Sequence, residues 1–121
     1  MADDQGSDMH VDNHVLNALR EVMEDEFALL LDTFLSDSDE RLRLLRQAQA
    51  QGDAQAMRMA AHSFKGSCSN MGAVLLASLC KQLEDLARRE QLDGVAPLLG
   101  HIEREFAIVR ILFKGERQRH R

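Results

Sequence analysis

The sequence predicts an all-α fold, namely an antiparallel up-down-up-down four-helix bundle with a short additional helix at its amino terminus. The chain holds one proline and long runs of Ala, Leu, Glu, Arg and Gln, which favour helix nearly everywhere. Its apolar residues recur at helical spacing in four long segments, and no segment alternates convincingly at period two. The connections between these segments are short, so neighbouring helices should be antiparallel. A chain of 121 residues, 45% of them hydrophobic, forms one ordinary domain.

The ends of the chain should lie outside the folded domain, which we expect over residues 10–115. Residues 1–9 are polar, acidic and without periodicity, so they should form a disordered tail, and residues 116–121 should form a basic tail that frays. Asp12 or Asn13 can cap a short first helix by accepting hydrogen bonds from free backbone N–H groups. The apolar residues that this helix should turn inward are Val15, Leu16, Leu19, Val22 and Met23.

A long helix should follow from about Asp25 to Ala50. The polar stretch at residues 36–40 interrupts its apolar stripe, and we expect a bend or a solvated middle there. Gly52 should end this helix in the left-handed conformation, and Asp53 should cap the next helix. The stripe consists of Phe27, Leu31, Phe34, Leu42 and Leu45.

Two shorter helices are expected next, over residues 53–72 and 73–90. Gly72 should end the first of them, because glycine adopts the left-handed conformation at low cost. Cys68 and Cys80 lie on or beside the core faces, so we interpret them as buried free thiols in a reducing compartment rather than a disulfide or a metal pair. The inward residues are Met57, Ala60, Ala61, Phe64, Cys68 and Met71 in the first helix, and Leu76, Leu79, Leu83 and Leu86 in the second.

The last helix should begin after Asp93, which can cap it. Pro97 falls in the first turn, where a missing N–H costs nothing. Ile108, Ile111 and Leu112 make this helix apolar on more than one side, which a weak self-association surface or a packed first helix would explain equally well. The inward stripe is Val95, Leu99, Ile102, Phe106, Val109 and Phe113.

Composition limits the partners and the compartment. The formal net charge is −5 and the acidic residues are spread over helix faces, so the chain lacks the basic footprint of a nucleic-acid binder, and we expect protein partners. No run of about eighteen apolar residues appears, which argues against a membrane span. The polar amino terminus has no secretory signal, so we expect a cytoplasmic protein.

One histidine lies outside the apolar stripe of its helix. A helix turns about 100° per residue, so His62 points well away from the inward face and should meet solvent. The residues that the same geometry gathers around it are Gln55, Arg58, Lys65, Gly66 and Ser69. This patch is cationic, hydroxyl-bearing and sterically open, which suits it to hold a phosphoryl group.

The residues around this histidine form a longer motif. It reads Ala-x-His-x-x-Lys-Gly-x-x-x-Asn-x-Gly-Ala and contains His62, Lys65, Gly66, Asn70, Gly72 and Ala73, preceded by Met59-Ala-Ala and followed by Leu79-Cys-x-x-Leu-Glu84. This pattern resembles the signature of histidine-containing phosphotransfer (HPt) domains, and the resemblance extends from about Val15 to Phe113. Because kinase and receiver modules are lacking, the chain is similar to the free-standing bacterial type.

The resemblance implies a histidine phosphotransfer protein of a multistep two-component phosphorelay. His62 would take a phosphoryl group from the aspartate of one receiver domain and pass it to the aspartate of another. The implied partners are receiver domains of hybrid sensor histidine kinases and of response regulators. Nothing resembles an ATP-binding loop or a Mg²⁺ site, so we expect no autonomous kinase activity and no cofactor, with Mg²⁺ in the partner receiver. We expect a monomer.

Four other residues have expected roles beside His62. Lys65, one turn ahead, should stabilise the charge of the phosphoryl oxygens, and Arg58, one turn behind, should be a secondary cation that the motif does not require. Gly66 should leave the ring accessible, which explains a residue that costs about 1 kcal/mol in a helix relative to alanine. Some family members carry glutamine where this chain has Glu84. Its carboxylate should either accept a bond from Nδ1–H and leave Nε2 free, or simply be solvated.

The receiver should dock on a partly apolar surface near His62. The residues expected there are Met59, Ser69, Leu19, Met23, Phe27 and Leu30. Two interpretations of Met59 stay open, since it either belongs to an exposed recognition patch or packs under the first helix. A non-catalytic helical adaptor is the alternative function. A metal-binding bundle would need inward ligand pairs such as Glu-x-x-His, which the long helices lack.

Overall fold

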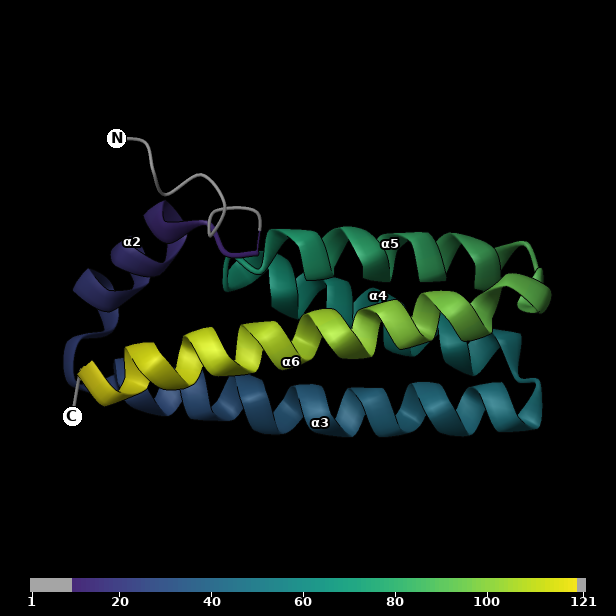
Figure 1. The fold of residues 1–121 in the computed structure, drawn as a ribbon, viewed down its shortest axis with the longest axis horizontal. Helices are drawn as coiled ribbons and strands as arrows, with labels where there is room; N and C mark the ends of the chain where they lie inside the picture. The colour runs from purple at the N-terminus through teal and green to yellow at the C-terminus, as the bar shows by residue number, and fades with distance from the viewer. Residues whose placement is uncertain (1–9, 120–121) are drawn as a thin grey trace.

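The computed structural model describes residues 10–119 and builds them into helices and turns. In chain order the elements are α2 (Asn13–Met23), a 3-10 turn η1 (Glu24–Glu26), α3 (Phe27–Gln51), α4 (Ala54–Asn70), α5 (Val74–Arg88), a 3-10 turn η2 (Leu92–Gly94) and α6 (Val95–Arg119). The four long helices run up, down, up and down, and α2 lies at one end of them (Figure 1). The predicted fold class is confirmed, while the tail expected at residues 1–9 lies outside the described residues.

The core lies between the four long helices, each of which contributes one apolar stripe. Packing joins α3 to α4, α4 to α5, α5 to α6 and α6 back to α3, so the bundle is closed (Figure 1). Aromatic rings connect three of these helices, because the ring of Phe34 lies 5.3 Å from that of Phe113 and Phe106 lies 6.3 Å from Phe64, centroid to centroid. The whole predicted stripe of α6 is buried. No helix within the described part of the chain is long and apolar enough to cross a membrane.

The first helix, α2, buries a narrower face than the sequence suggested. Asp12 is its cap, since the Asp12 carboxylate accepts a hydrogen bond from the backbone N–H of His14 at 2.9 Å. Leu16 is buried, but Val22 is 78% exposed, so the inward prediction is wrong for Val22. On a helical wheel Val22 lies about 120° away from Leu16. A helix at the end of a bundle is packed on one side only, and Val22 lies outside that packed side.

Helix α3 is continuous through its polar stretch, and of the two expectations for residues 36–40, a bend or a solvated middle, the structure shows the solvated middle. The acidic side chains there are exposed, and two of them bind basic partners: Glu40 accepts from Arg43 at 2.7 Å, and Asp39 pairs with Arg110. Ser38, in contrast, is fully buried, and its hydroxyl has no hydrogen-bond partner among residues 10–119. The stretch is thus one helical segment with polar groups outside and one polar residue inside.

Replacing Ser38 with alanine should stabilise the bundle. A buried hydroxyl without a partner costs about 1–3 kcal/mol, and alanine is also the better helix former. We expect the free energy of unfolding, measured by urea denaturation, to rise by about 1 kcal/mol. A lower free energy of unfolding for Ser38→Ala than for wild type would show that the hydroxyl stabilises the fold.

The turns between helices follow the predicted glycine and aspartate signals. Gly52 is left-handed with φ 64°, and the Asp53 carboxylate caps α4 by accepting from the Ala56 N–H at 3.0 Å. Gly72 is left-handed with φ 78°, and a Cβ there would lie 3.0 Å from the carbonyl oxygen of Asp12. The Asp12 N–H donates to the Gly72 carbonyl at 2.7 Å, which ties the start of α2 to the α4–α5 turn.

Helix α6 differs from the prediction at both ends. Asp93 lies inside η2 and Gly94 directly precedes the helix, so the predicted cap is wrong. The helix continues to Arg119, past the point at which we expected fraying, because side chains of its last turns bind other helices. Arg117 donates to Asp32 of α3 at 3.1 Å, and Glu116 accepts from Arg20 of α2 at 2.5 Å.

The surplus apolar residues of α6 are partly explained by α2. Leu112 packs against the core and, with Leu16 of α2, lines a groove of about 370 Å³. Ile111 lines the same groove but is 71% exposed. Packing of the first helix therefore accounts for Leu112 but not for Ile111. Self-association through this surface stays a prediction.

Candidate functional site

His62 projects into solvent from the middle of α4, as its position outside the apolar stripe predicted. Its side chain is 65% exposed, whereas Met57, Ala61 and Phe64 on the opposite side of the same helix are fully buried. The core residues fix the rotation of α4 about its axis, because turning the helix would expose them. The hydrophobic stripe therefore determines which way the imidazole faces.

The neighbouring helix α5 places Glu84 beneath the imidazole. The His62 Nδ1 donates to Glu84 Oε2 at 2.9 Å, and Lys65 Nζ donates to Glu84 Oε1 at 2.9 Å. The Glu84 side chain is only 3% exposed, so it is not an ordinary solvated glutamate. The expected contact with His62 is present. His62 Nε2 forms no hydrogen bond with any residue from 10 to 119 and remains open to solvent.

Arg88 binds the Glu84 carboxylate in addition to His62 and Lys65, and it is not among the residues predicted from the sequence. Its guanidinium donates to Glu84 Oε2 at 3.1 Å and to Asp85 at 2.8 Å. The four-residue spacing between Glu84 and Arg88 on one helix was a usable signal. Arg58, which we expected to be the second cation, is half-buried and makes no hydrogen bond or ion pair within the described chain, so its role stays a prediction.

The charges around Glu84 keep its carboxylate ionised. Burial acts to raise the pKa of Glu84, but the hydrogen bonds from Lys65 and His62, with their charges, outweigh burial and lower that pKa below its ordinary value. An ionised carboxylate can only accept hydrogen bonds, so the hydrogen shared with His62 belongs to the ring. The contact thus selects the tautomer that has Nδ1 protonated and a lone pair on Nε2.

This lowered pKa predicts a pH dependence of stability. The folded state binds the Glu84 proton less readily than the unfolded state, so its stabilising contribution is present above about pH 4.3 and is lost as pH falls through the lower folded value. We expect wild type to exceed Glu84→Gln in unfolding free energy at pH 7, and this difference to shrink towards pH 3. A constant Glu84 difference over that range would contradict the ion pairing.

Gly66 lies one turn beyond His62, and nothing in the part of the chain that the structure describes requires glycine there. The residue is exposed, and a Cβ built on it would meet no atom within 4 Å. The open surface that we expected beside the ring is therefore present. Alanine at this position would stabilise the helix, so we expect the advantage of glycine to lie in contact with a partner protein.

Gly66→Ala should make the protein more stable but slower in phosphoryl transfer. We expect the free energy of unfolding to rise by about 1 kcal/mol and the rate of phosphoryl transfer from a receiver to fall by about tenfold, because the methyl group hinders close approach. Gly115→Ala in α6 is the matched control, with the same gain in stability and an unchanged transfer rate. Equal transfer rates in wild type and Gly66→Ala would remove access as the reason for glycine.

The expected docking residues divide into three groups. Met59 is 58% exposed and Ser69 is exposed, so both are available to a partner, and the packing of Met59 under the first helix is excluded. Phe27 is 0% exposed, so its assignment to the docking surface is wrong. It begins the inward stripe of α3 and is covered by Arg20, whose guanidinium carbon lies 5.5 Å from the ring centroid. The half-buried residues that pack against the core are Leu19, Met23 and Leu30.

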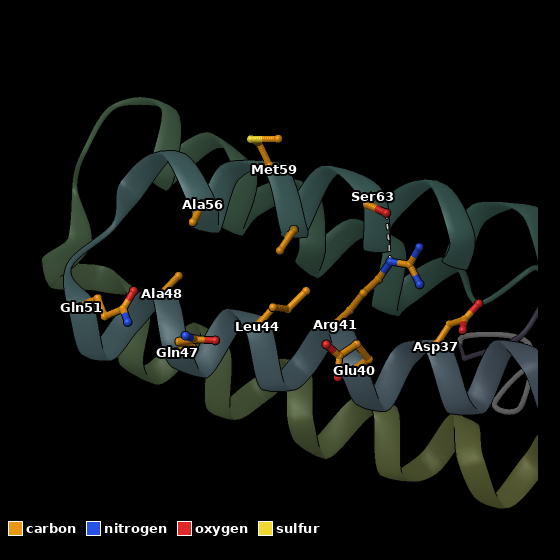
Figure 2. Close-up of a pocket in the computed structure, with 11 residues that line it drawn as sticks. Asp37, Glu40, Arg41, Leu44, Gln47, Ala48, Gln51, Ala56, Met59 and Ser63 are labelled. Atoms are coloured by element: carbon orange, nitrogen blue, oxygen red, sulfur yellow. Dashed lines mark hydrogen bonds between the residues drawn. The ribbon is translucent and has the colours of Figure 1, made fainter.

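A groove between α3 and α4 extends the surface next to His62. It has a volume of about 680 Å³, and Leu44 and Met59 lie on opposite sides of it (Figure 2). Arg41 crosses the groove and donates to Ser63, the residue after His62, at 2.9 Å (Figure 2). The groove therefore reaches Met59 and Ser63, which lie in α4 three residues before His62 and one residue after it.

The two cysteines are buried and free, as predicted. A hydrogen bond with Cys80 and burial both raise the pKa of the Cys68 thiol, which keeps it protonated. Among residues 10–119, no three His, Cys, Asp or Glu side chains come together in a way that could hold a metal ion.

A buried carboxylate that holds an exposed imidazole on the surface of a four-helix bundle is the arrangement expected of a histidine phosphotransfer domain. A model of the Hpt domain family matches residues 29–111, and the chain belongs to this family. A solved structure, that of histidine-containing phosphotransfer protein B (HptB) from Pseudomonas aeruginosa PAO1, is 63% identical in sequence. It superposes with a TM-score of 0.91 over 93% of this chain and 97% of that one. No curated protein sequence matches significantly. Family and structural likeness together support a phosphotransfer role in a phosphorelay.

Proposed function

We propose that His62 is the phosphoacceptor of this phosphorelay protein. It accepts a phosphoryl group from the aspartate of a receiver domain in a hybrid sensor kinase and passes the group to the aspartate of a response-regulator receiver. The single observation that carries this proposal is the environment of the ring, which is 65% exposed and has Nδ1 bound to Glu84. An oriented ring on an open surface can enter a receiver's acidic pocket without a conformational change in the bundle.

The transfer is a displacement at phosphorus. The lone pair of His62 Nε2 forms the N–P bond while the P–O bond to the receiver aspartate breaks, and its electron pair stays on the aspartate carboxylate. Onward transfer to the second receiver is the reverse displacement. The chain contributes the nucleophile and positive charge, with no cofactor of its own, and the Mg²⁺ that assists transfer belongs to the receiver.

Lys65 is proposed to stabilise the charge of the phosphoryl oxygens. Its ammonium group lies on Glu84 Oε1 at 2.9 Å, one turn ahead of His62, and the side chain is 27% exposed. A lysine held this way is available to a second anion near the ring. Because Arg88 also binds Glu84, the carboxylate keeps a cationic partner when Lys65 interacts with phosphate.

Partners and location are part of the same proposal. Exposed Met59 and Ser69, together with the adjacent α3–α4 groove, offer a receiver domain an apolar surface beside His62. We place the protein in the cytoplasm as a monomer with no nucleic-acid or membrane partner, because its net charge of −5 and its free thiols suit that role.

The test follows label from a receiver to this chain. A receiver domain is phosphorylated with labelled phosphate, mixed with the wild-type protein, and separated on a gel. We expect the label to move to this chain within seconds to minutes, to resist alkali, and to be lost in acid, as a phosphohistidine is. A helical adaptor would bind the receiver without gaining label, and that result would contradict the proposal.

A further inference from the structure

The buried carboxylate under His62 has a consequence for the phosphorylated state. Glu84 Oε2 lies 2.9 Å from Nδ1, on the side of the ring opposite to the nitrogen that receives phosphorus in the proposed function. When Nε2 bonds to phosphorus, no proton leaves the ring in that step. The product is a phosphorylated imidazolium that still carries hydrogen on Nδ1 and a positive charge.

The fate of that hydrogen decides how reactive the phosphohistidine is. If Nδ1 keeps it, the ring departs in the next transfer as neutral imidazole, which is a good leaving group. If Nδ1 loses it, the ring would depart as an imidazolate anion, which is poor, and a proton would have to return first. An amide such as glutamine can accept the same hydrogen bond, but it adds no negative charge to hold the proton.

Resting on the proposed function, we infer that Glu84 keeps the Nδ1 proton on phosphorylated His62 and so keeps its phosphoryl group ready for transfer. Glu84 touches neither phosphorus nor the receiver in this role and acts through the ring, as a positioning residue. The lowered pKa of Glu84 supports this assignment, because the carboxylate itself does not take the proton at neutral pH.

The other charged groups near the ring either favour loss of the Nδ1 proton or are paired with an opposite charge. Lys65 and Arg88 are cations that would favour loss of the proton, but both bind Glu84. Within α5, Asp85 accepts from Arg88 and also from Lys81 at 3.0 Å. The remaining cations on the sides of α4 and α3 are Arg58, which has no ion pair in the described structure, and Arg41, which donates to Ser63. Glu84 Oε2 is the anionic atom in direct contact with Nδ1.

The experiment compares the pH profile of onward transfer in wild type and Glu84→Gln. Both proteins are first phosphorylated by a labelled receiver, and the release of label to a second receiver is then timed from pH 5 to pH 9. As pH rises, the transfer rate of each protein should fall, and the midpoint of this fall should lie at least about one pH unit higher in wild type than in Glu84→Gln. At neutral pH the variant should transfer about tenfold more slowly, and lowering the pH should restore its rate. Superimposable profiles would overturn the inference.

Asp85→Asn is the matched control for charge. It removes a carboxylate from the adjacent position of α5, bound to the same Arg88, but it does not contact the ring. We expect its pH midpoint to match that of wild type. A shift as large as that of Glu84→Gln would show that general charge near the site, rather than the contact with Nδ1, controls the proton.

A second measurement does not depend on the folding of any variant. Wild-type protein with ¹⁵N-labelled histidine is phosphorylated, and the protonation of Nδ1 is followed by NMR against pH, in buffer and in denaturing urea. The folded protein should keep the Nδ1 proton to a pH at least about one unit higher than the unfolded chain. Equal midpoints would overturn the inference alone, because phosphohistidine would still have formed. Failure of wild type to gain any phosphoryl group would instead refute the proposed function.

Discussion

Replacing His62 with glutamine is expected to abolish phosphoryl acceptance from a receiver. Glutamine has no nucleophilic nitrogen, because its amide lone pair is delocalised, so the rate of labelling should fall by at least about a thousandfold. The fold should survive, since the side chain is 65% exposed, and the amide of glutamine can still donate to the buried Glu84. The measurement is label transfer in the assay described above, with circular dichroism to confirm folding.

His101→Gln is the control for His62→Gln. His101 is also an exposed histidine on a long helix, but it lies on α6 and has no neighbouring Lys-Gly pair. Its variant should accept label at the wild-type rate. Retention of label by His62→Gln, or loss of label in His101→Gln, would show that the acceptor has been assigned to the wrong residue.

Lys65→Ala should give the second-largest effect, a decrease of about a hundredfold in the transfer rate. Removing one preorganised positive group from a transition state typically costs this much, because the developing charge on the phosphoryl oxygens is left to solvent. Stability should fall only in part, because Glu84 loses its bond to Lys65 but keeps those to His62 and Arg88. Stopped-flow or rapid-quench kinetics with a phosphorylated receiver would measure the rate.

Two further variants test whether Lys65 acts through its charge and position. Lys65→Arg should recover most of the lost rate, since it restores a cation on the same turn. Lys81→Ala, which removes an α5 lysine that binds Asp85, should leave the rate unchanged. If Lys65→Ala transfers at the wild-type rate, Lys65 has no part in the mechanism.

The fold could be predicted from the sequence because each long helix carries one apolar stripe and because left-handed glycines follow α3 and α4. The errors arose where tertiary contacts outweighed local pattern. The polar stretch of α3 was expected to be solvated or bent; its acidic residues are exposed, but Ser38 within it is buried in the core. The basic end of α6 suggested fraying, but Arg117 is held by Asp32 of a helix far away in the sequence.

The site was predictable to the extent that one helix determines it. Periodicity alone places His62, Lys65 and Gly66 on the solvent side of α4. The burial of Glu84 could not be predicted in this way, because it depends on how α5 packs against α4. Phe27 was assigned to the docking surface although periodicity also placed it in the inward stripe of α3; it is fully buried, and Arg20 of α2 lies over its ring.

The central claim is that the open Nε2 of His62 carries the phosphoryl group while Glu84 occupies Nδ1. Its most direct test is a ³¹P–¹⁵N correlation NMR spectrum of the wild-type protein, labelled with ¹⁵N-histidine and phosphorylated by a receiver. We predict one phosphorus signal coupled to Nε2 of His62. Coupling to Nδ1, or to the nitrogen of any other histidine, would contradict the account.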